Sequence, residues 1–354
     1  MKVSTPGRIC LFGEHQDYLG LPVIAAAINL RVEVKGKFSK SKVVSLDLPN
    51  IEMVSFFNLM DTFNYSETRD YFKSSINVLK RHGFTFSFGL DCIINGNIPL
   101  NSGTSSSSAL TVSWIGFLSR MADNPKELSA IEIGKLAYLA EVEEFNEAGG
   151  MMDHFSTACG NVIYLNSLPE VKVEFLRPKF GKFVLGDSHQ PKDTVGILKR
   201  VKFGMLEILS KINKINPDFD LKKSNLLEAN EYKDLLSKQE MMLLKGNIDD
   251  KDILIEALAV LRANELNHQK FGQLLNQHQY NLAVNKNISI PKIDKMIEAA
   301  LQNGALGAKI NGSGGGGCMF AYCPENADEV AKAIKKVGGT PHIIEIGDGI
   351  KYED

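Results

Sequence analysis

The chain has 354 residues, of which 44% are hydrophobic and 23% charged, with a formal net charge of -2. These values are typical of a globular protein of about two domains, and the small net charge argues against a dedicated nucleic-acid binder. The five cysteines are scattered without a CxxC pair, which argues against a zinc site or a disulfide framework.

The first segment with chemical character is PGRICLFGEHQDY, residues 6–18. It gathers Glu14, His15 and Asp17 on one loop after an apolar run. On these residues alone, a capped and solvated turn is the favoured interpretation, although a carboxylate that accepts from two hydroxyls is also a good anchor for a sugar. Arg8 has small and apolar neighbours, which favours a buried position over a surface salt bridge.

Alternating apolar residues predict strands after this loop. Residues 22–37 are expected to form a half-buried strand pair, and residues 84–94 a strand that ends at the turn Asn95-Gly96-Asn97. The first motif begins a few residues after Met1 and no apolar run reaches the length of a bilayer span. We therefore expect a cytoplasmic protein without a signal peptide or membrane contact.

A second motif, PLNSGTSSSSA, occupies residues 99–109. Gly103 to Ser107 carry no bulky apolar side chain and lead directly into the apolar positions of a helix predicted at 106–121. The first backbone N–H groups of a helix are unpaired and lie at the positive end of its dipole, so this junction favours an anion such as phosphate. A serine run is also what a helix N-cap would show.

The remaining elements are expected in a mixed order. A helix is predicted at 125–146, a break at 148–150, and a new element from residue 151. The later elements are a strand at 183–187, helices at 193–212, 250–277, 291–303 and 326–337, and strands at 305–310, 318–323 and 342–346. This order predicts an α+β protein with domains at 1–180 and 181–354 and a cleft between them.

The third motif is NGSGGGGC, residues 311–318. Its flanks are strand-like, so the glycines are interpreted as a tight connection within a fold, although a flexible linker would have the same composition. The chain lacks the GxxxxGK[ST] pattern of a P-loop, and it lacks the HRD and DFG motifs of protein kinases.

Taken together, the three motifs resemble those of the GHMP kinase superfamily, over nearly the whole length. The Gly-Glu-His-x-Asp-Tyr stretch that begins at Gly13 is most similar to the galactokinase branch, as is the pattern Ala140-Glu141 followed by Gly150-Met151-Met152-Asp153. The resemblance implies an N-terminal domain like that of ribosomal protein S5, a ferredoxin-like α+β C-terminal domain, and an active site in the cleft between them.

The resemblance also implies roles for individual residues. Arg8 and Asp153 match the catalytic pair, and ATP and Mg²⁺ are the implied cofactors. The acceptor-binding positions are Glu14, His15, Asp17, Gly150, Asp153, Gly314 and Gly315. The nucleotide-binding positions are Asn101, Ser102, Gly103, Thr104, Ser105, Ser106, Ser107 and Ser108. Ser107 and Glu141 match the positions that supply oxygen ligands to the metal, a hard cation that prefers such donors.

The chain departs from the galactokinase pattern at several positions. Asn101 and Thr104 replace a glycine and a leucine, and His154 replaces a glutamine. Ser313 and Gly315 stand in place of a small apolar residue and an aromatic one, and residues 187–194 do not match the segment that helps to shape the acceptor pocket. The acceptor sugar is therefore open, whereas the phosphoryl-transfer residues are present.

The leading prediction is an ATP-dependent kinase that phosphorylates a sugar hydroxyl, with C1 of galactose or a related monosaccharide first. One alternative enzyme is a kinase whose acceptor is an amino sugar, a uronic acid or a mevalonate-like alcohol. Another is a diphosphomevalonate decarboxylase. A uronate would need an extra cation, for which Lys192 is the candidate. A non-catalytic sensor of sugar and nucleotide is the alternative outside enzymes. Both a monomer and a homodimer are open.

Overall fold

The computed structural model describes residues 1–59, 61, 63, 65, 69–99, 103–192 and 194–353. The strands within these residues are β1 (Lys2–Phe12), β2 (Val23–Ser39), β3 (Val43–Leu48), β4 (Met53–Asn58), β5 (Gly89–Gly96), β6 (Val162–Asn166), β7 (Lys172–Leu176), β8 (Phe183–Asp187), β9 (Gly307–Ile310), β10 (Cys318–Tyr322), β11 (Thr340–Ile344) and β12 (Lys351–Glu353).

The helices are α1 (Tyr71–Arg81), α2 (Ser106–Met121), α3 (Ala130–Tyr138), α4 (Met152–Cys159), α5 (Thr194–Asn213), α6 (Leu226–Asn230), α7 (Lys238–Arg262), α8 (His268–Tyr280), α9 (Pro291–Gln302) and α10 (Ala327–Lys336). Short turns of 3₁₀-helix lie at Asp17–Leu19 and Pro49–Ile51, and turns of π-helix at Leu139–Glu143 and Asn281–Asn285. In the described part of the chain, none of these helices is both long and apolar enough to cross a membrane.

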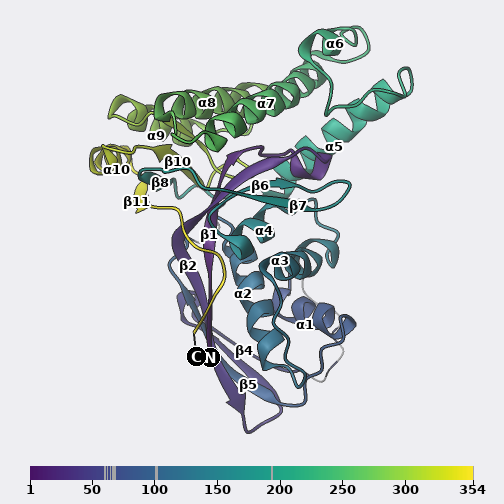
Figure 1. Ribbon diagram of the computed structural model, residues 1–354, viewed down its shortest axis with the longest axis vertical. Coiled ribbons are helices and arrows are strands. Elements are labelled where there is room, and N and C mark those ends of the chain that lie inside the picture. The colour runs from purple at the N-terminus through teal and green to yellow at the C-terminus, as the bar shows by residue number, and fades with distance from the viewer. Residues whose placement is uncertain are drawn as a thin grey trace.

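The first sheet forms the long axis of the molecule. Its strands follow the order β12-β1-β2-β5-β3-β4, with β6 paired to β2 and β7 paired to β6. Helices α1 to α4 lie beside these long strands (Figure 1), with α2 packed on β1 and β2. The apolar residues of α2, from Ala109 to Leu118, are buried in the core between helix and sheet. The start of α2 is therefore held firmly beside β1.

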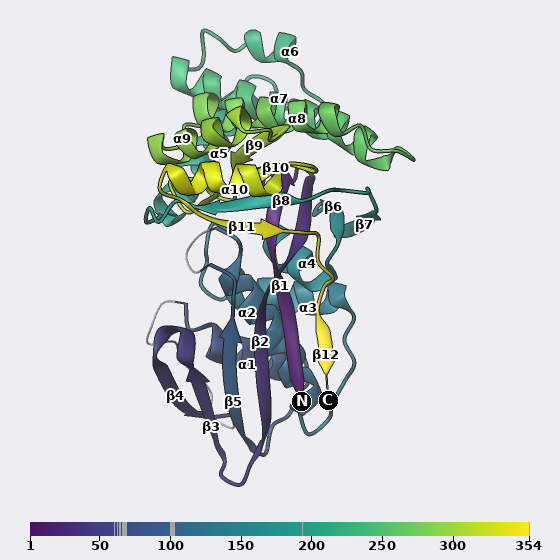
Figure 2. The ribbon, with the colours of Figure 1, turned by 90° about the vertical axis from the view of Figure 1, so that its left-hand side faces the viewer.

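The second sheet, in the order β11-β8-β10-β9, is antiparallel and buried on both faces. Alternate residues of β8 and β10 belong to different cores: Phe183 and Phe320 pack with α7 and α8, whereas Val184 and Met319 pack with α9 and α10. This alternation is the period of two that a strand imposes on its side chains. The sheet and its helices cap one end of the long first sheet (Figure 2).

The α+β class is confirmed, and the helix predicted at 106–121 matches α2. Several predicted elements need correction. The strand predicted at 84–94 begins at Gly89 and runs through the expected turn to Gly96. The helix predicted at 125–146 begins at Ala130 and continues as a π-turn that ends at Glu143. Residues 22–37 form one long strand, β2, rather than a strand pair. The helix predicted at 250–277 is two helices, α7 and α8, because the chain leaves the helix at Ala263, which is extended (φ -64°, ψ 149°), and α8 restarts with Asn267 as its N-cap.

The domain boundary at residue 180 stays a prediction. The second sheet lies wholly within residues 183–344, as expected for a unit that begins at 181. The end of the chain does not stay with that unit. The chain leaves the second sheet after β11, and β12 pairs with β1 of the first sheet. Bridges from Ile346 to Ile28 and from Asp348 to Gly160 mark the route of this return.

Candidate active site

The three sequence motifs converge on one cavity of about 760 Å³. The predicted site residues that line it are Arg8, Glu14, His15, Asp17, Gly103, Ser105, Ser106, Ser107, Ser108, Glu141, Gly150 and Asp153. From the third motif the cavity takes Gly312 and Ser313 instead of Gly314 and Gly315. Asn101 and Ser102 lie outside the described residues.

The start of α2 forms the anion-binding end of the cavity. Ser105 has a left-handed backbone (φ 61°), and its carbonyl accepts the bond from Ala109 N at 2.9 Å. The N–H groups of Ser106, Ser107 and Ser108 precede that bond and are the unpaired donors of the helix end. They supply the backbone donors and the dipole that a nucleotide phosphate requires.

The phosphate loop (residues 103–108) is fixed by the other two motifs. Gly103 O accepts from Arg8 Nη1 at 2.5 Å and from Asn311 Nδ2 at 2.9 Å. Asn311 Oδ1 accepts from Cys10 N at 2.9 Å, and Arg8 N donates to Thr104 O at 3.1 Å. Thr104 is buried and positions the loop without lining the cavity.

Arg8 forms an ion pair with Asp153. Its Nε donates to Asp153 Oδ1 at 2.8 Å, and Nη2 lies 2.6 Å from the same oxygen. Register shifts of β1 against β2 flank Arg8, and irregularities of this kind re-aim side chains. Burial opposes the charge on Asp153, but the Arg8 guanidinium and then His154 hold the pKa of this carboxyl below its usual value. The carboxylate can therefore accept a hydrogen bond from an alcohol.

The acidic end of the cavity is formed by the acceptor loop (residues 13–18). Asp17 Oδ2 accepts from Met152 N at 3.1 Å and Oδ1 from Tyr18 N at 2.9 Å. Burial raises the pKa of Asp17, the Met152 N–H opposes this rise, and the charge of Asp153 adds to it. A Cβ on Gly150 would fall 1.9 Å from Asp17 Oδ2, so glycine is required there for the carboxylate to reach its position.

His15 has a neutral ring with a defined tautomer. Its Nε2 lies 3.0 Å from Ser313 O, which can only accept, so Nε2 carries the proton and Nδ1 accepts from Tyr18 Oη at 2.8 Å. Burial, followed by the nearby charge of Lys286, lowers the pKa of His15 to about 3. The residue also has a left-handed backbone (φ 64°), a sparsely populated state for a residue with a Cβ.

Glu14 is almost fully buried, and one of its oxygens contacts Lys309 Nζ. Its other oxygen, Oε2, has no hydrogen bond to any described residue. Burial opposes the charge of Glu14, but Lys309 and then His278 hold its pKa below the usual value. Glu14 lines the cavity, but Oε2 is buried and lies 3.6 Å from the buried His278 Nε2.

Glu141 and Ser107 face the same cavity and offer hard oxygen donors. Glu141 lies on the π-turn after α3, and its Oε2 accepts from His154 Nε2 at 2.9 Å. Its second oxygen is thus left for a cation. Among the described residues, no group of three or more His, Cys, Asp or Glu side chains could hold a metal alone. One carboxylate and one hydroxyl nevertheless fit Mg²⁺, which keeps waters and binds substrate phosphates.

Lys192 adds a second cation at the phosphate end. A Cβ on Gly103 would lie 2.6 Å from Lys192 Nζ, and one on Gly312 would lie 3.6 Å from it. Burial and then the charge of Arg8 lower the pKa of Lys192 to about 8. The sequence predicted only that Lys192 would suit an acceptor carboxylate, whereas its ammonium lies beside the phosphate loop.

Gly314 and Gly315 contact other parts of the fold. Both have positive φ angles (83° and 74°), and Gly315 N donates to Ile288 O at 2.7 Å. A Cβ on Gly314 would meet Ile288 at 2.6 Å, and one on Gly315 would meet Ile197 at 2.1 Å. Their predicted role next to the acceptor stays a prediction. Asn311 and Ser313, in the same motif, make the site contacts, and no feature of the sequence distinguishes them from the glycines in this respect.

This fold and this cavity define a phosphotransferase for a small molecule. Backbone N–H groups at the start of α2, suited to bind phosphate, line the same cavity as the ionised Asp153. Comparisons with known proteins extend this conclusion. Residues 70–161 match the family described as GHMP kinases N terminal domain, and residues 254–340 match GHMP kinases C terminal. Residues 2–37 match the galactokinase galactose-binding signature.

Two relatives are similar to this protein over almost the full length of the chain. A mevalonate kinase of Pyrococcus furiosus is 31% identical over 366 residues, covering 100% of this chain and 99% of that protein. A galactokinase of Staphylococcus saprophyticus is 28% identical over 372 residues, covering 99% of this chain and 95% of that protein. The chain therefore belongs to the GHMP kinase family, whose members phosphorylate alcohol groups with ATP as the phosphate donor.

Solved structures agree on the fold. Lactococcus lactis galactokinase complexed with galactose aligns with a TM-score of 0.87 at 24% identity, over 99% of this chain and 94% of that one. Methanococcus jannaschii mevalonate kinase aligns with a TM-score of 0.75 at 22% identity, over 98% of both chains. The predicted GHMP kinase fold is thus confirmed.

Proposed function

We propose that the protein is a sugar kinase that transfers the γ-phosphoryl group of ATP to a monosaccharide hydroxyl, with C1 of galactose as the first candidate. The observation that carries this proposal is the position of Asp17 beside Asp153 in the cavity, with Gly150 leaving room for its carboxylate. Carboxylates that accept from hydroxyls bind polyols well and repel an anionic acceptor. The galactose-binding signature over residues 2–37 supports the same acceptor.

Asp153 is proposed to orient the acceptor hydroxyl and to take its proton late in the reaction. A carboxylate is a far weaker base than an alkoxide, so early and complete deprotonation is not expected. A loose phosphoryl-transfer transition state does not require it. Arg8 keeps Asp153 ionised and stabilises charge on the transferred group, and Ser107 and Glu141 are proposed to hold Mg²⁺, which would neutralise phosphate charge.

Mevalonate is the second candidate, because the mevalonate kinase of Pyrococcus furiosus is 31% identical to this chain over its full length. Mevalonate carries a carboxylate and would need a cation at the acceptor end. Outside the Arg8–Asp153 pair, two described cations line the cavity. The Lys192 ammonium lies beside Gly103 of the phosphate loop, and Arg69 is paired with Glu147. This placement favours a neutral sugar.

The test is release of ADP in the presence of ATP and Mg²⁺ with galactose, related monosaccharides, uronic acids and mevalonate. We expect turnover with galactose or a close analogue and none with mevalonate. Turnover of mevalonate alone would replace the proposal with the second candidate. Sugar binding measured by calorimetry without turnover of any compound would instead indicate a sensor. A cytoplasmic location and the choice between monomer and homodimer remain predictions.

A further inference from the structure

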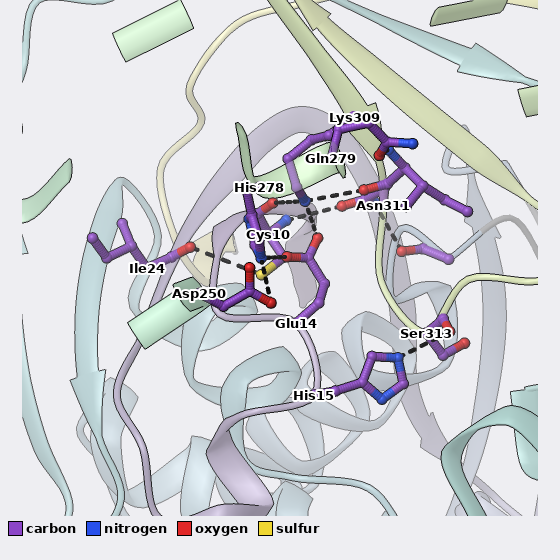
Figure 3. Close-up of polar contacts among 12 residues, drawn as sticks. Cys10, Glu14, His15, Ile24, Asp250, His278, Gln279, Lys309, Asn311 and Ser313 are labelled. Carbon is purple, nitrogen blue, oxygen red and sulfur yellow. Dashed lines mark hydrogen bonds and ion pairs between the residues drawn. The ribbon is translucent and has the colours of Figure 1, made fainter. Parts of the chain in front are cut away.

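Five ionisable side chains form a buried ion cluster next to the acceptor loop: Glu14, Asp250, His278, Lys286 and Lys309. Each is at most 1% exposed. They come from the acceptor loop, α7, α8, the segment after the second π-turn, and β9. Figure 3 shows the side chains of Glu14, His278, Asp250 and Lys309 directed toward one another, with His15 on the same loop as Glu14.

The contacts of the cluster join the second half of the chain to the acceptor loop. Lys309 Nζ contacts Glu14 and donates to Cys10 O and Ile310 O, each at 3.0 Å. His278 Nε2 lies 3.6 Å from Glu14 Oε2 and 3.5 Å from Asp250 Oδ2. The cluster thus pairs two carboxylates with two ammonium groups and one imidazole.

Lys286 makes the contact that reaches the loop backbone. Its Nζ lies 2.8 Å from Asp250 Oδ2 and donates to Glu14 O at 2.9 Å. Asp250 is in turn held by Asn281 Nδ2, which donates to Oδ1 at 3.0 Å. The carbonyl that accepts from Lys286 belongs to the peptide unit that joins Glu14 to His15, so the ammonium sets the orientation of that unit.

The backbone of the next residue requires such support. His15 has φ 64°, a conformation that persists only when its surroundings hold it. Its side chain and that of Asp17 line the cavity. A buried ion pair adds little stability compared with apolar residues of the same volume. We therefore expect the Lys286–Asp250 pair to affect the geometry of the loop backbone more than the stability of the protein.

We propose that Lys286, held in place by Asp250, is a positioning residue for acceptor binding, although neither residue lines the cavity. The pair fixes the carbonyl of Glu14 and thereby the placement of His15 and Asp17 against the acceptor. The proposal rests on the proposed function in one respect only, that residues 13–18 bind the acceptor.

Lys286→Met removes the donor to Glu14 O and leaves Asp250 without its ammonium partner. Asp250→Asn keeps that donor, and the double variant Asp250→Asn/Lys286→Met removes the donor without leaving a buried charge. Lys251→Met is the matched control, because Lys251 is also buried, follows Asp250 on α7, and donates to a backbone carbonyl, Ser224 O, at 2.7 Å. It makes this contact away from the acceptor loop.

We expect the KM for the acceptor to rise about tenfold or more in Lys286→Met and in the double variant, because both lose a charged hydrogen bond to the loop. The KM for ATP should change less than about twofold. Lys251→Met should lose thermal stability and keep the acceptor KM. Asp250→Asn, which keeps the donor but weakens its anchor, should raise the acceptor KM less than Lys286→Met does. A double variant that recovers both its thermal stability and the acceptor KM would overturn the proposal, since the cluster would then act through stability alone.

Hydrogen exchange gives a readout that needs no acceptor. Amides of residues 13–18 should exchange faster in Lys286→Met than in Lys251→Met, measured with ATP alone under conditions where both variants are folded. Equal exchange of that loop in the two variants would also overturn the proposal. Faster exchange together with no turnover of any sugar would uphold the positioning role and contradict the proposed sugar kinase activity.

Discussion

The guanidinium of Arg8 lies 2.6 Å from the carboxylate of Asp153, although the two residues are 145 positions apart in the chain. The Asp153 side chain keeps about a third of its surface exposed toward the cavity, whereas Arg8 is buried. The pair therefore presents an ionised carboxylate to the cavity.

Asp153→Asn is expected to lower kcat by at least about a hundredfold, because an amide cannot accept the proton of the acceptor hydroxyl. ATP affinity should stay near that of the wild type, since Arg8 still donates to Gly103 O in the phosphate loop. Steady-state ADP release and nucleotide binding would measure the two effects. A variant that turns over at the wild-type rate would remove Asp153 from its proposed role.

Gly150→Ala is expected to raise the acceptor KM strongly with little effect on the KM for ATP. The new Cβ would fall 1.9 Å from Asp17 Oδ2 and displace that carboxylate. Gly149→Ala is the matched control, because a Cβ there would meet only Val142 at 3.5 Å, an ordinary contact. Equal acceptor KM values in the two variants would argue against acceptor binding by Asp17.

Lys192 should give the reaction a basic limb in its pH profile. Its pKa is lowered to about 8, so the ammonium is charged below that pH and becomes neutral above it. We expect kcat/KM for ATP to fall as the pH rises through about 8. Lys192→Met should have low activity without this limb, and Lys192→Arg should retain activity at higher pH. A wild-type limb that persists in Lys192→Met would assign the titration to another group.

His15 should make stability depend on pH below neutrality. Its pKa is about 3 in the folded protein, against about 6.5 in the unfolded chain, so only the unfolded state takes up a proton between these values. The stabilising contribution is complete above about pH 6.5 and is lost as the pH falls toward 3. In urea unfolding, the wild type should lose up to about 1.4 kcal/mol per pH unit more than His15→Asn on acidification. Parallel curves for the two proteins would contradict this assignment.

Glu141→Gln should raise the Mg²⁺ concentration needed for half-maximal rate, because an amide oxygen is a poorer ligand for a hard cation than a carboxylate. Glu143→Gln is the control, since Glu143 is exposed on the same π-turn and does not line the cavity. A magnesium titration of both variants provides the measurement. The same midpoint in both would place the cation elsewhere.

The local elements could be predicted because their signals are local. The serine run followed by apolar residues gave α2 at its correct bounds, and the motif residues Arg8, Asp17 and Asp153 all reach the cavity. The contact of Asn311 with Gly103 could not be predicted, since it joins residues 208 positions apart and depends on how the two sheets meet.

The buried ion cluster was missed for a related reason. Asp250 and Lys286 lie in polar stretches that resemble the exposed face of a helix, and only tertiary packing buries them. The π-turn that carries Glu141 likewise has no composition that separates it from the α-helix before it. The residue types of the motifs were sufficient to predict their chemistry. The burial of Asp250 and Lys286 and their pairing could be recognised only in the folded structure.

The return of β12 to β1 brings the two ends of the chain side by side, in the half of the long sheet that lies away from the second sheet (Figure 2). Lys2 pairs there with Glu353, so a short linker could join the termini without bending any strand. A circular permutant with the two ends joined in this way should therefore keep both sheets.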